Sequence, residues 1–289
     1  MPSKKKTILR IFIYLVLAFA PAFSVELIFS DKQGSVTNVF WGATLMLYPA
    51  IASVITRLVT KEGFRDAMLG FGKRGSGKYY AAAVIYPVVL PFVSALILHL
   101  FIVENGSISE SGFGSDIVMG AASLLIAVIS GIATAFHGLG EELGWRGYLT
   151  PKLEQLMPTP AAIVVTGIIW ALWHGPLVAY GYDFGRDYDF FPYGGFIAMI
   201  VMCIFWSAVL TWLTKRTGSV YPAALCHMLI DTVLTAVFMP FACNADGEKF
   251  AYRTNEFWML IISVFPMIII CGAVCMVLIC KKDKKAAKA

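Results

Sequence analysis

The sequence has 289 residues, of which 58% are hydrophobic and only 14% are charged. A soluble globular domain contains roughly 45–50% apolar and about 25% charged residues, so this composition excludes a soluble domain and predicts an integral membrane protein. The net charge of +5 does not indicate nucleic-acid binding, because the basic residues lie beside apolar segments, where membrane topology explains them. The expected partners are membrane lipids and no nucleic acid.

About eight apolar segments are long enough, at about 20 residues each, to form membrane-spanning helices. They cover residues 9–29, 39–59, 79–103, 117–137, 160–181, 195–214, 219–241 and 257–280. Ala18-Phe19-Ala20 resembles a signal-peptidase site, but the apolar segment continues to Phe29, which favours an uncleaved first helix. The sequence therefore predicts an all-α fold, a polytopic transmembrane helix bundle with about eight spans.

Basic residues recur in alternate loops. The N-terminus, the loops after the second, fourth and sixth segments, and the C-terminal tail contain Lys and Arg, whereas loop 104–116 has neither. Loops rich in Lys and Arg stay on the cytoplasmic side of a membrane. The pattern predicts a multi-pass cell-membrane protein with both termini in the cytoplasm, and it predicts that residues 138–149 lie at the cytoplasmic end of the fourth segment.

The stretch GLGEELGWRGYL holds two adjacent glutamates, Glu141 and Glu142, followed by Arg146. On a helix Glu142 and Arg146 are four residues apart and share a face, so they can pair. Glu141 then points about 100° away and is free for another role. Charged residues within a span cost about 2.5–3.5 kcal/mol each and usually mark function. The alternative is an interfacial ion pair that ends a helix, with Gly144 and Gly147 as helix breakers, but one glutamate is enough for that.

Two further motifs hold histidines inside apolar segments. His174 lies one turn after Trp170 and just before Pro176, which ends or kinks the helix. His227 and Asp231 are four residues apart and share one helix face. Taken singly, the first motif is explained by a hydrogen-bonded core histidine and the second by an Asp–His pair that joins two helices.

Taken together, the two glutamates, two histidines and one aspartate on three helices form the inventory of a hydrolytic site. Glu141, His174 and His227 are candidate ligands of a Zn²⁺ ion with an open position for water. The alternative is that one glutamate acts without metal as the general base on a water molecule. The sequence contains no HExxH, no GxSxG and no Gly-rich phosphate loop.

Three stretches, EELGWR (141–146), WALWH (170–174) and HMLID (227–231), resemble in order the three motifs of the CPBP family. The family patterns are EExxxR, FxxxH and HxxxN or HxxxD, and the family includes type II CAAX prenyl proteases and bacteriocin-processing (Abi) enzymes. The motifs cover roughly the second half of the chain. The resemblance divides the chain into N-terminal transmembrane helices over 1–115 and a CAAX-protease-like catalytic core over 116–289.

The resemblance implies an eight-helix intramembrane endopeptidase with a cavity open toward the cytoplasm. It implies that Glu141 is the base that activates water, and that His174 orients this water or binds a metal with it. It further implies that Glu142 and Arg146 brace the site. The implied substrate is a membrane-bound peptide or protein, such as a prenylated (CAAX-type) peptide or a bacteriocin leader.

The third motif is implied to stabilise the oxyanion through His227 and residue 231. The family commonly has Asn at this last position, and an ionised Asp231 cannot donate a hydrogen bond to an oxyanion. Asp231 must therefore be protonated or serve another role, such as fixing the tautomer of His227 or binding metal. In the second motif Trp170 replaces Phe, which is a mild aromatic change.

In this topology the first and second motifs are expected at different depths in the membrane. Glu141 is expected near the inner surface, whereas His174 is about 14 residues into its segment, roughly 20 Å deep. For the two to meet, either the fourth or the fifth segment must begin later than drawn. Pro151, Pro158 and Pro160 favour the second option.

Two other functions are compatible with the sequence. One is a non-catalytic membrane scaffold or regulator that kept the protease fold, although every motif residue is retained. The other is a small transporter whose buried Glu and His residues relay protons, although no internal repeat supports it.

The aromatic and acidic segment 180–195 is interpreted as an interfacial aromatic belt. The sequence does not define an oligomeric state.

Overall fold

The computed structural model of the protein describes residues 3–29 and 44–286, and over these residues it contains helices and no strand. The predicted all-α fold is therefore confirmed. The longer helices are α1 (Lys4–Phe29), α3 (Tyr48–Val59), α4 (Gly77–Phe101), α5 (Ile117–Ala133), α6 (Ala135–Gly144), α8 (Thr159–Trp173), α10 (Tyr193–Thr217), α11 (Tyr221–Val233), α13 (Glu256–Ser263) and α14 (Phe265–Ala286). The short ones are η2 (Ile108–Glu110), η3 (Trp145–Leu149), α7 (Thr150–Leu153), α9 (Gly175–Ala179), η4 (Leu234–Phe238) and α12 (Met239–Phe241).

Among the described residues, five helical segments are long and apolar enough to cross a membrane. They are Lys4–Ile28, Gly77–Phe101, Tyr193–Thr217, Tyr221–Phe241 and Glu256–Lys281. A sixth is the pair Ile117–Ala133 and Ala135–Leu153, bent by 50°, whereas α3 and α8 are apolar but shorter. The polytopic bundle is thus confirmed, with five or six such spans where the sequence predicted about eight. The predicted segment 39–59 begins outside the described residues.

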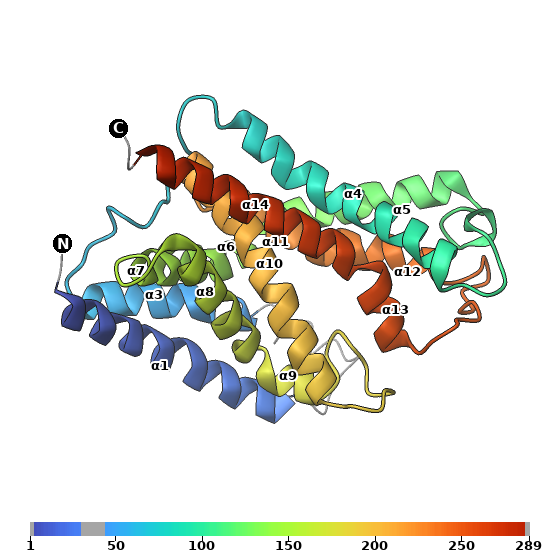
Figure 1. Ribbon diagram of the computed structural model, residues 1–289, viewed down its shortest axis with the longest axis horizontal. Helices are drawn as coiled ribbons and strands as arrows, with labels where there is room; N and C mark the ends of the chain where they lie inside the picture. The colour runs from blue at the N-terminus through green and yellow to red at the C-terminus, as the bar shows by residue number, and fades with distance from the viewer. Residues whose placement is uncertain (1–2, 30–43, 287–289) are drawn as a thin grey trace.

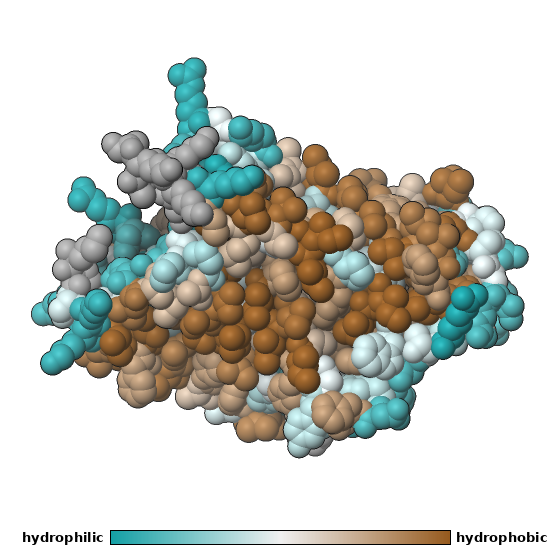
Figure 2. Space-filling view, viewed as in Figure 1, coloured by the Kyte–Doolittle hydropathy of each residue, from teal (hydrophilic) through white to brown (hydrophobic). Residues whose placement is uncertain are grey.

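The surface agrees with this assignment. Figure 2 shows hydrophobic side chains along the middle of the molecule and hydrophilic side chains mainly toward its two ends. Inside the bundle, α10 packs against α8, α11 and α14, and α11 packs against α4, α5 and α6 (Figure 1). Helix α6 also packs against α3, and α3 packs against α1. The helices that carry the three motifs therefore meet in the centre of the bundle.

The fourth predicted segment differs from its expected extent. It bends at Thr134, whose Oγ1 donates a hydrogen bond to the carbonyl oxygen of Ser130 over 2.7 Å, a type of bond that often bends helices. It then continues through α6, η3 and α7 as far as Leu153. Both glutamates are buried inside the bundle, on the part of the helix that continues beyond the predicted end of the segment at residue 137. The fourth segment ends later than drawn, whereas α8 begins at Thr159, close to its expected start.

The glycines of α6 allow close helix packing rather than ending the helix. A Cβ atom on Gly138 would lie 2.5 Å from the carbonyl oxygen of Ala224 in α11, and one on Gly144 would lie 2.4 Å from Pro49 Cβ in α3. Contacts this short are sterically forbidden, so glycine lets α6 fit between its two neighbours. The interpretation of Gly144 and Gly147 as helix breakers is wrong, because the chain continues from α6 directly into η3.

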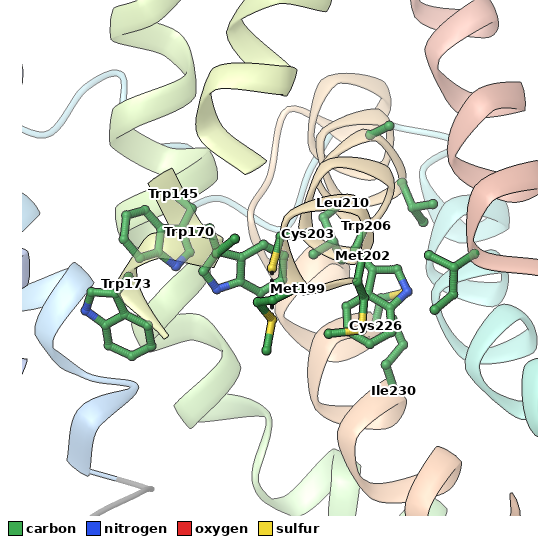
Figure 3. Packing of buried hydrophobic residues seen from close by; sticks show 14 of the residues in the cluster. Trp145, Trp170, Trp173, Met199, Met202, Cys203, Trp206, Leu210, Cys226 and Ile230 are labelled. Carbon is green, nitrogen blue, oxygen red and sulfur yellow. Dashed lines mark hydrogen bonds between the residues drawn. The ribbon is translucent and has the colours of Figure 1, made fainter. Parts of the chain in front are cut away.

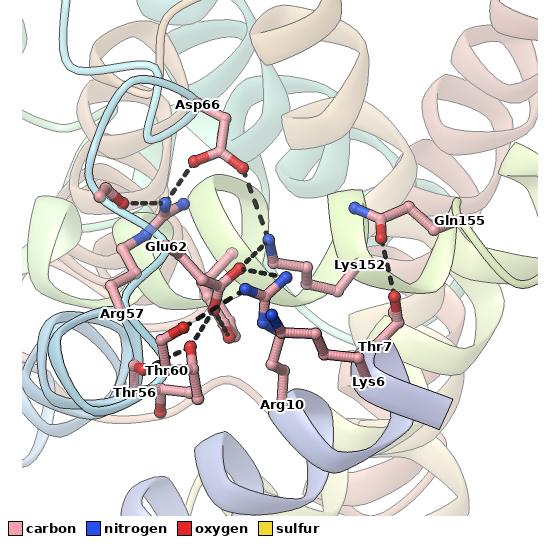
Figure 4. Close-up of polar contacts among 12 residues, drawn as sticks. Lys6, Thr7, Arg10, Thr56, Arg57, Thr60, Glu62, Asp66, Lys152 and Gln155 are labelled. Atoms are coloured by element: carbon pink, nitrogen blue, oxygen red, sulfur yellow. Dashed lines mark hydrogen bonds and ion pairs between the residues drawn. The ribbon is translucent and has the colours of Figure 1, made fainter. Parts of the chain in front are cut away.

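An ion network joins α1, α3 and α7 at the end of the molecule where both termini lie (Figures 1 and 4). Glu62 pairs with Lys152 and, over 3.3 Å, with Arg10, and its side chain is only 3% exposed. Asp66 pairs with Arg57 and lies 3.5 Å from Lys152. The network therefore connects the loop after α3 to helices that are distant in sequence.

The same network reaches the segment that follows the two glutamates. Tyr148 Oη in η3 donates a hydrogen bond to Glu62 Oε1 over 2.7 Å, and Arg57 Nη2 donates to the carbonyl oxygen of Gly147 over 3.1 Å. Burial raises the pKa of Glu62, but hydrogen bonds from Lys152 and Tyr148 outweigh it, so the pKa lies below its usual value of 4.5. The folded protein therefore holds this carboxylate in its charged form.

We predict that Glu62→Gln lowers the free energy of unfolding by about 3 kcal/mol at pH 7, because it leaves buried cations without their anion. A lowered folded-state pKa contributes stability above the unfolded value of 4.5 and loses it as the pH falls through the folded value. The gap between the thermal midpoints of wild type and variant should be constant from pH 7 to 5 and shrink below 4.5. Thermal unfolding in detergent over this pH range measures the gap, and a gap that grows on acidification contradicts the prediction.

Candidate active site

The three motifs converge as the sequence predicts. Glu141 and Glu142 lie on α6, His174 ends α8, and His227 lies on α11. Helix α8 stops at His174 because Pro176 follows and supplies no backbone N–H to continue the helix.

Glu142 is the centre of a buried group that we call the Glu142 cluster, consisting of Glu142, Arg146, Ser207 and His227. Glu142 Oε1 accepts a hydrogen bond from Arg146 Nη1 over 2.8 Å and lies 2.8 Å from His227 Nδ1. Arg146 Nη2 donates to Ser207 Oγ on α10 over 3.0 Å, and its guanidinium lies 4.4 Å from the centre of the Trp170 ring. These contacts agree with the implied role of Glu142 and Arg146 as the brace of the site.

Glu141 has a different environment from its neighbour. Its Oε2 atom accepts hydrogen bonds from Trp145 Nε1 over 3.0 Å and from Trp170 Nε1 over 2.7 Å. Figure 3 shows both indoles side by side within the buried cluster. The second oxygen, Oε1, makes no hydrogen bond to the described residues. Among the described residues, Glu141 is therefore held through one oxygen only.

His174 is oriented by its own helix. Its Nδ1 atom lies 3.0 Å from the carbonyl oxygen of Trp170. A carbonyl oxygen only accepts, so Nδ1 carries the hydrogen and Nε2 of the neutral ring keeps a lone pair. The ring of Tyr182 lies parallel to the imidazole, with 6.2 Å between centroids and 6° between planes. Part of the segment interpreted as an aromatic belt therefore folds back over the site.

The third motif places a histidine between two acids. His227 Nδ1 faces the Glu142 carboxylate and therefore donates to it, which directs Nε2 toward Asp231 Oδ2 at 3.7 Å. This distance is too long for a hydrogen bond but within ion-pair range. The Asp231 side chain is 41% exposed, whereas His227 is buried. The site is therefore most open on the side of Asp231.

The predicted zinc ligands do not gather in this arrangement. Among the described residues, no group of three or more His, Cys, Asp or Glu side chains has a spacing that could hold a metal ion. In this geometry the donor set of Glu141, His174 and His227 is therefore not spaced to fit a zinc ion.

Several site residues were missed at the sequence level. The indole N–H groups of Trp145 and Trp170 hold Glu141, so replacing the family's Phe by Trp170 adds a hydrogen-bond donor and is more than a mild aromatic change. The i, i+4 spacing of Glu141 and Trp145 could have signalled the first contact. Ser207 and Tyr182 lie on segments without a motif, and no local signal points to them.

Together these features define a polytopic helical membrane protein with a buried carboxylate–histidine site. Residues 115–233 match the family model described as type II CAAX prenyl endopeptidase Rce1-like, a range that contains all three motifs. The chain is also 29% identical over 149 residues to CAAX prenyl protease 2 of Methanococcus maripaludis. The alignment covers 50% of this chain and 52% of the relative, so the chain spans about half the length of the curated relative that it matches. The resemblance to the family of intramembrane CAAX proteases is confirmed by these two findings.

We predict that Ser207→Ala lowers the free energy of unfolding by about 1.5–3 kcal/mol, because it leaves a buried donor of Arg146 without an acceptor. Ser94→Ala is the matched control, since Ser94 is equally buried but its Oγ has no hydrogen-bond partner among the described residues. This control should be neutral or slightly stabilising. Thermal midpoints of the two variants in detergent make the comparison, and an equal change in both contradicts the prediction.

Proposed function

We propose that the chain is an intramembrane endopeptidase that hydrolyses membrane-associated peptides, with prenylated CAAX-type tails as the substrate class. The observation that carries the proposal is the unequal environment of two adjacent carboxylates. Glu142 is bonded to Arg146 and His227, whereas one oxygen of Glu141 has no hydrogen-bond partner among the described residues. The printed activity of the relative, a CAAX prenyl protease, supports the choice of substrate.

The proposed reaction uses Glu141 as the general base. Glu141 Oε1 takes a proton from a water molecule, and Nε2 of His174 orients this water by accepting its second hydrogen. The resulting hydroxide attacks the peptide carbonyl and forms a tetrahedral oxyanion. Glu141 then returns the proton to the leaving nitrogen, the C–N bond breaks, and a carboxylate and an amine are released.

His227 is the proposed donor to the oxyanion. Because its Nδ1 hydrogen is used by Glu142, only Nε2 faces the open side of the site. A proton on Nε2 both makes the 3.7 Å approach of Asp231 favourable and provides a donor for developing negative charge. Asp231 then holds the charge and orientation of His227 and does not itself bind the oxyanion.

The proposed orientation places both termini in the cytoplasm. The paired cations Arg10, Arg57 and Lys152 belong to the ion network at the end of the molecule that carries the termini (Figures 1 and 4). Lys and Arg concentrate on the cytoplasmic side of membrane proteins.

The alternative of a non-catalytic scaffold receives less support. A scaffold has no need of a buried carboxylate that two indoles hold through one oxygen while the other oxygen has no partner among the described residues.

We predict that Glu141→Gln lowers kcat by about 10²–10⁴-fold, because the amide cannot take a proton from water. The assay is cleavage of a quenched fluorescent peptide with a farnesylated CAAX tail by purified protein in mild detergent. Glu256→Gln is the matched control, since Glu256 pairs with Lys249 on the exposed surface and should leave cleavage unchanged.

Metal analysis of the same samples tests the zinc prediction. Chelator-resistant cleavage without stoichiometric zinc supports the glutamate-base mechanism. Stoichiometric zinc with chelator-sensitive cleavage contradicts that mechanism and restores Glu141, His174 and His227 as ligands. Cleavage that survives in Glu141→Gln contradicts the proposed role of Glu141.

A further inference from the structure

The loop between α9 and α10 brings one aromatic side chain to the candidate active site (Figure 1). Segment 180–195 is interpreted from the sequence as an interfacial belt, but the ring of Tyr182 lies parallel to the imidazole of His174, with 6.2 Å between centroids. This distance is within the range of roughly 4.5–7 Å for interacting aromatic rings. Tyr182 is 43% exposed, so its ring lies on the accessible side of the half-buried His174. The proposed reaction gives Tyr182 no role.

His174 needs a second support if its Nε2 atom is to stay directed at the reacting water. It directly follows the last residue of α8, and the one hydrogen bond of its imidazole to the described residues runs from Nδ1 to the carbonyl oxygen of Trp170. This bond fixes the tautomer, but the ring can still tilt about it. The rings of Trp170 and Trp173 also lie near the imidazole, yet both belong to the same helix end. Tyr182 contacts it from a different segment.

The loop holds Tyr182 in place through its backbone and through a buried neighbour. The backbone N–H of Tyr182 donates to the carbonyl oxygen of Leu177 over 3.0 Å, and its carbonyl oxygen accepts from the N–H of Phe184 over 2.8 Å. Phe184 is buried, and its ring lies 6.1 Å from that of Phe257 and 6.4 Å from that of Phe265. The loop is therefore anchored on α13 and α14, independently of α8.

The residue between Tyr182 and this anchor has an uncommon backbone conformation. Asp183 has a φ of 64°, in the left-handed region that residues with a side chain rarely adopt. Such a conformation persists only where the surrounding structure holds it, and strained residues cluster at functional sites. Here the hydrogen bond from Phe184 to Tyr182 and the burial of Phe184 hold it. The chain thus keeps a strained residue in the turn that directs Tyr182 toward His174.

We propose that Tyr182 is a positioning residue for His174. Its ring restricts the tilt of the imidazole, so that Nε2 stays directed at the water that Glu141 activates. The inference rests on the proposed endopeptidase function. Because the contact is made by the ring, it requires an aromatic side chain and not the phenolic hydroxyl. Holding a catalytic group in its productive orientation raises the rate of the chemical step more than it raises the affinity for the substrate.

The test compares two variants of Tyr182 in the cleavage assay with the farnesylated CAAX peptide. Tyr182→Phe keeps the ring and should keep kcat within about twofold of wild type, whereas Tyr182→Ala should lower kcat about 10–100-fold with a smaller change in KM. Tyr193→Ala is the matched control, since Tyr193 follows in the same segment, is 64% exposed and contacts the ring of Phe190; it should keep the wild-type kcat. An unchanged kcat in Tyr182→Ala overturns the proposal. Equal losses in Tyr182→Phe and Tyr182→Ala also overturn it, because they assign the effect to the hydroxyl.

Thermal midpoints in detergent separate positioning from a structural role. Phe184→Ala removes the buried anchor and should lower the midpoint and kcat together. Tyr182→Ala removes a partly exposed ring, so its midpoint should fall much less although its kcat falls. An equal fall of the midpoint in both variants would show that Tyr182 is structural and would overturn the proposal. If wild type does not cleave the peptide, the proposed function itself fails. If wild type cleaves it and Tyr182→Ala keeps its kcat, only the inference about Tyr182 fails.

Discussion

The neutralisation of Glu142 is the interaction on which the rest of the site depends. Two adjacent carboxylates inside a helix bundle repel each other and lose their hydration, and neither cost is tolerable without specific partners. The Glu142 cluster supplies a guanidinium and an imidazole to one of them and spreads over α6, η3, α10 and α11. Successive helical residues point about 100° apart, so Glu141 faces α8 and meets Trp170 instead. One carboxylate thus becomes structural, and its neighbour is left available for proton transfer.

This division of roles requires close packing around α6. The Gly138 backbone touches α11 and the Gly144 backbone touches α3, which brings Glu142 within 2.8 Å of His227. The following turn, η3, is held from its other side by Arg57 and Glu62 of the ion network, which bond the Gly147 carbonyl oxygen and the Tyr148 hydroxyl. These polar groups of the interior therefore form two sets that meet at η3. The ion network lies at the end of the molecule with the termini, and the Glu142 cluster lies at the centre of the bundle.

The sequence predicted the elements that have a strong local signal. Long apolar runs identified the helices, and the four-residue spacings of Glu142 with Arg146 and of His227 with Asp231 identified pairs that the structure contains. The end of the fourth segment was predicted too early, because hydropathy ends a span where polar residues begin. In this fold those residues are paired internally, and the helix continues to Leu153.

Contacts between segments that are distant in sequence could not be predicted from the sequence. The sequence shows that positions 170 and 182 are aromatic, but it does not show where the side chains of Trp170 and Tyr182 point. Whether an indole N–H meets Glu141 or a tyrosine ring covers His174 depends on how α6, α8 and the loop after α9 pack.

The most direct test of this account compares the thermal midpoints of Glu141→Gln and Glu142→Gln in the same detergent. Glutamine at 141 can still accept from both indoles, so its midpoint should stay near that of wild type. Glutamine at 142 leaves Arg146 and His227 without their anion and should lower the free energy of unfolding by about 3–5 kcal/mol. If Glu141→Gln is the strongly destabilised variant and Glu142→Gln is not, the division of roles between the two carboxylates is contradicted.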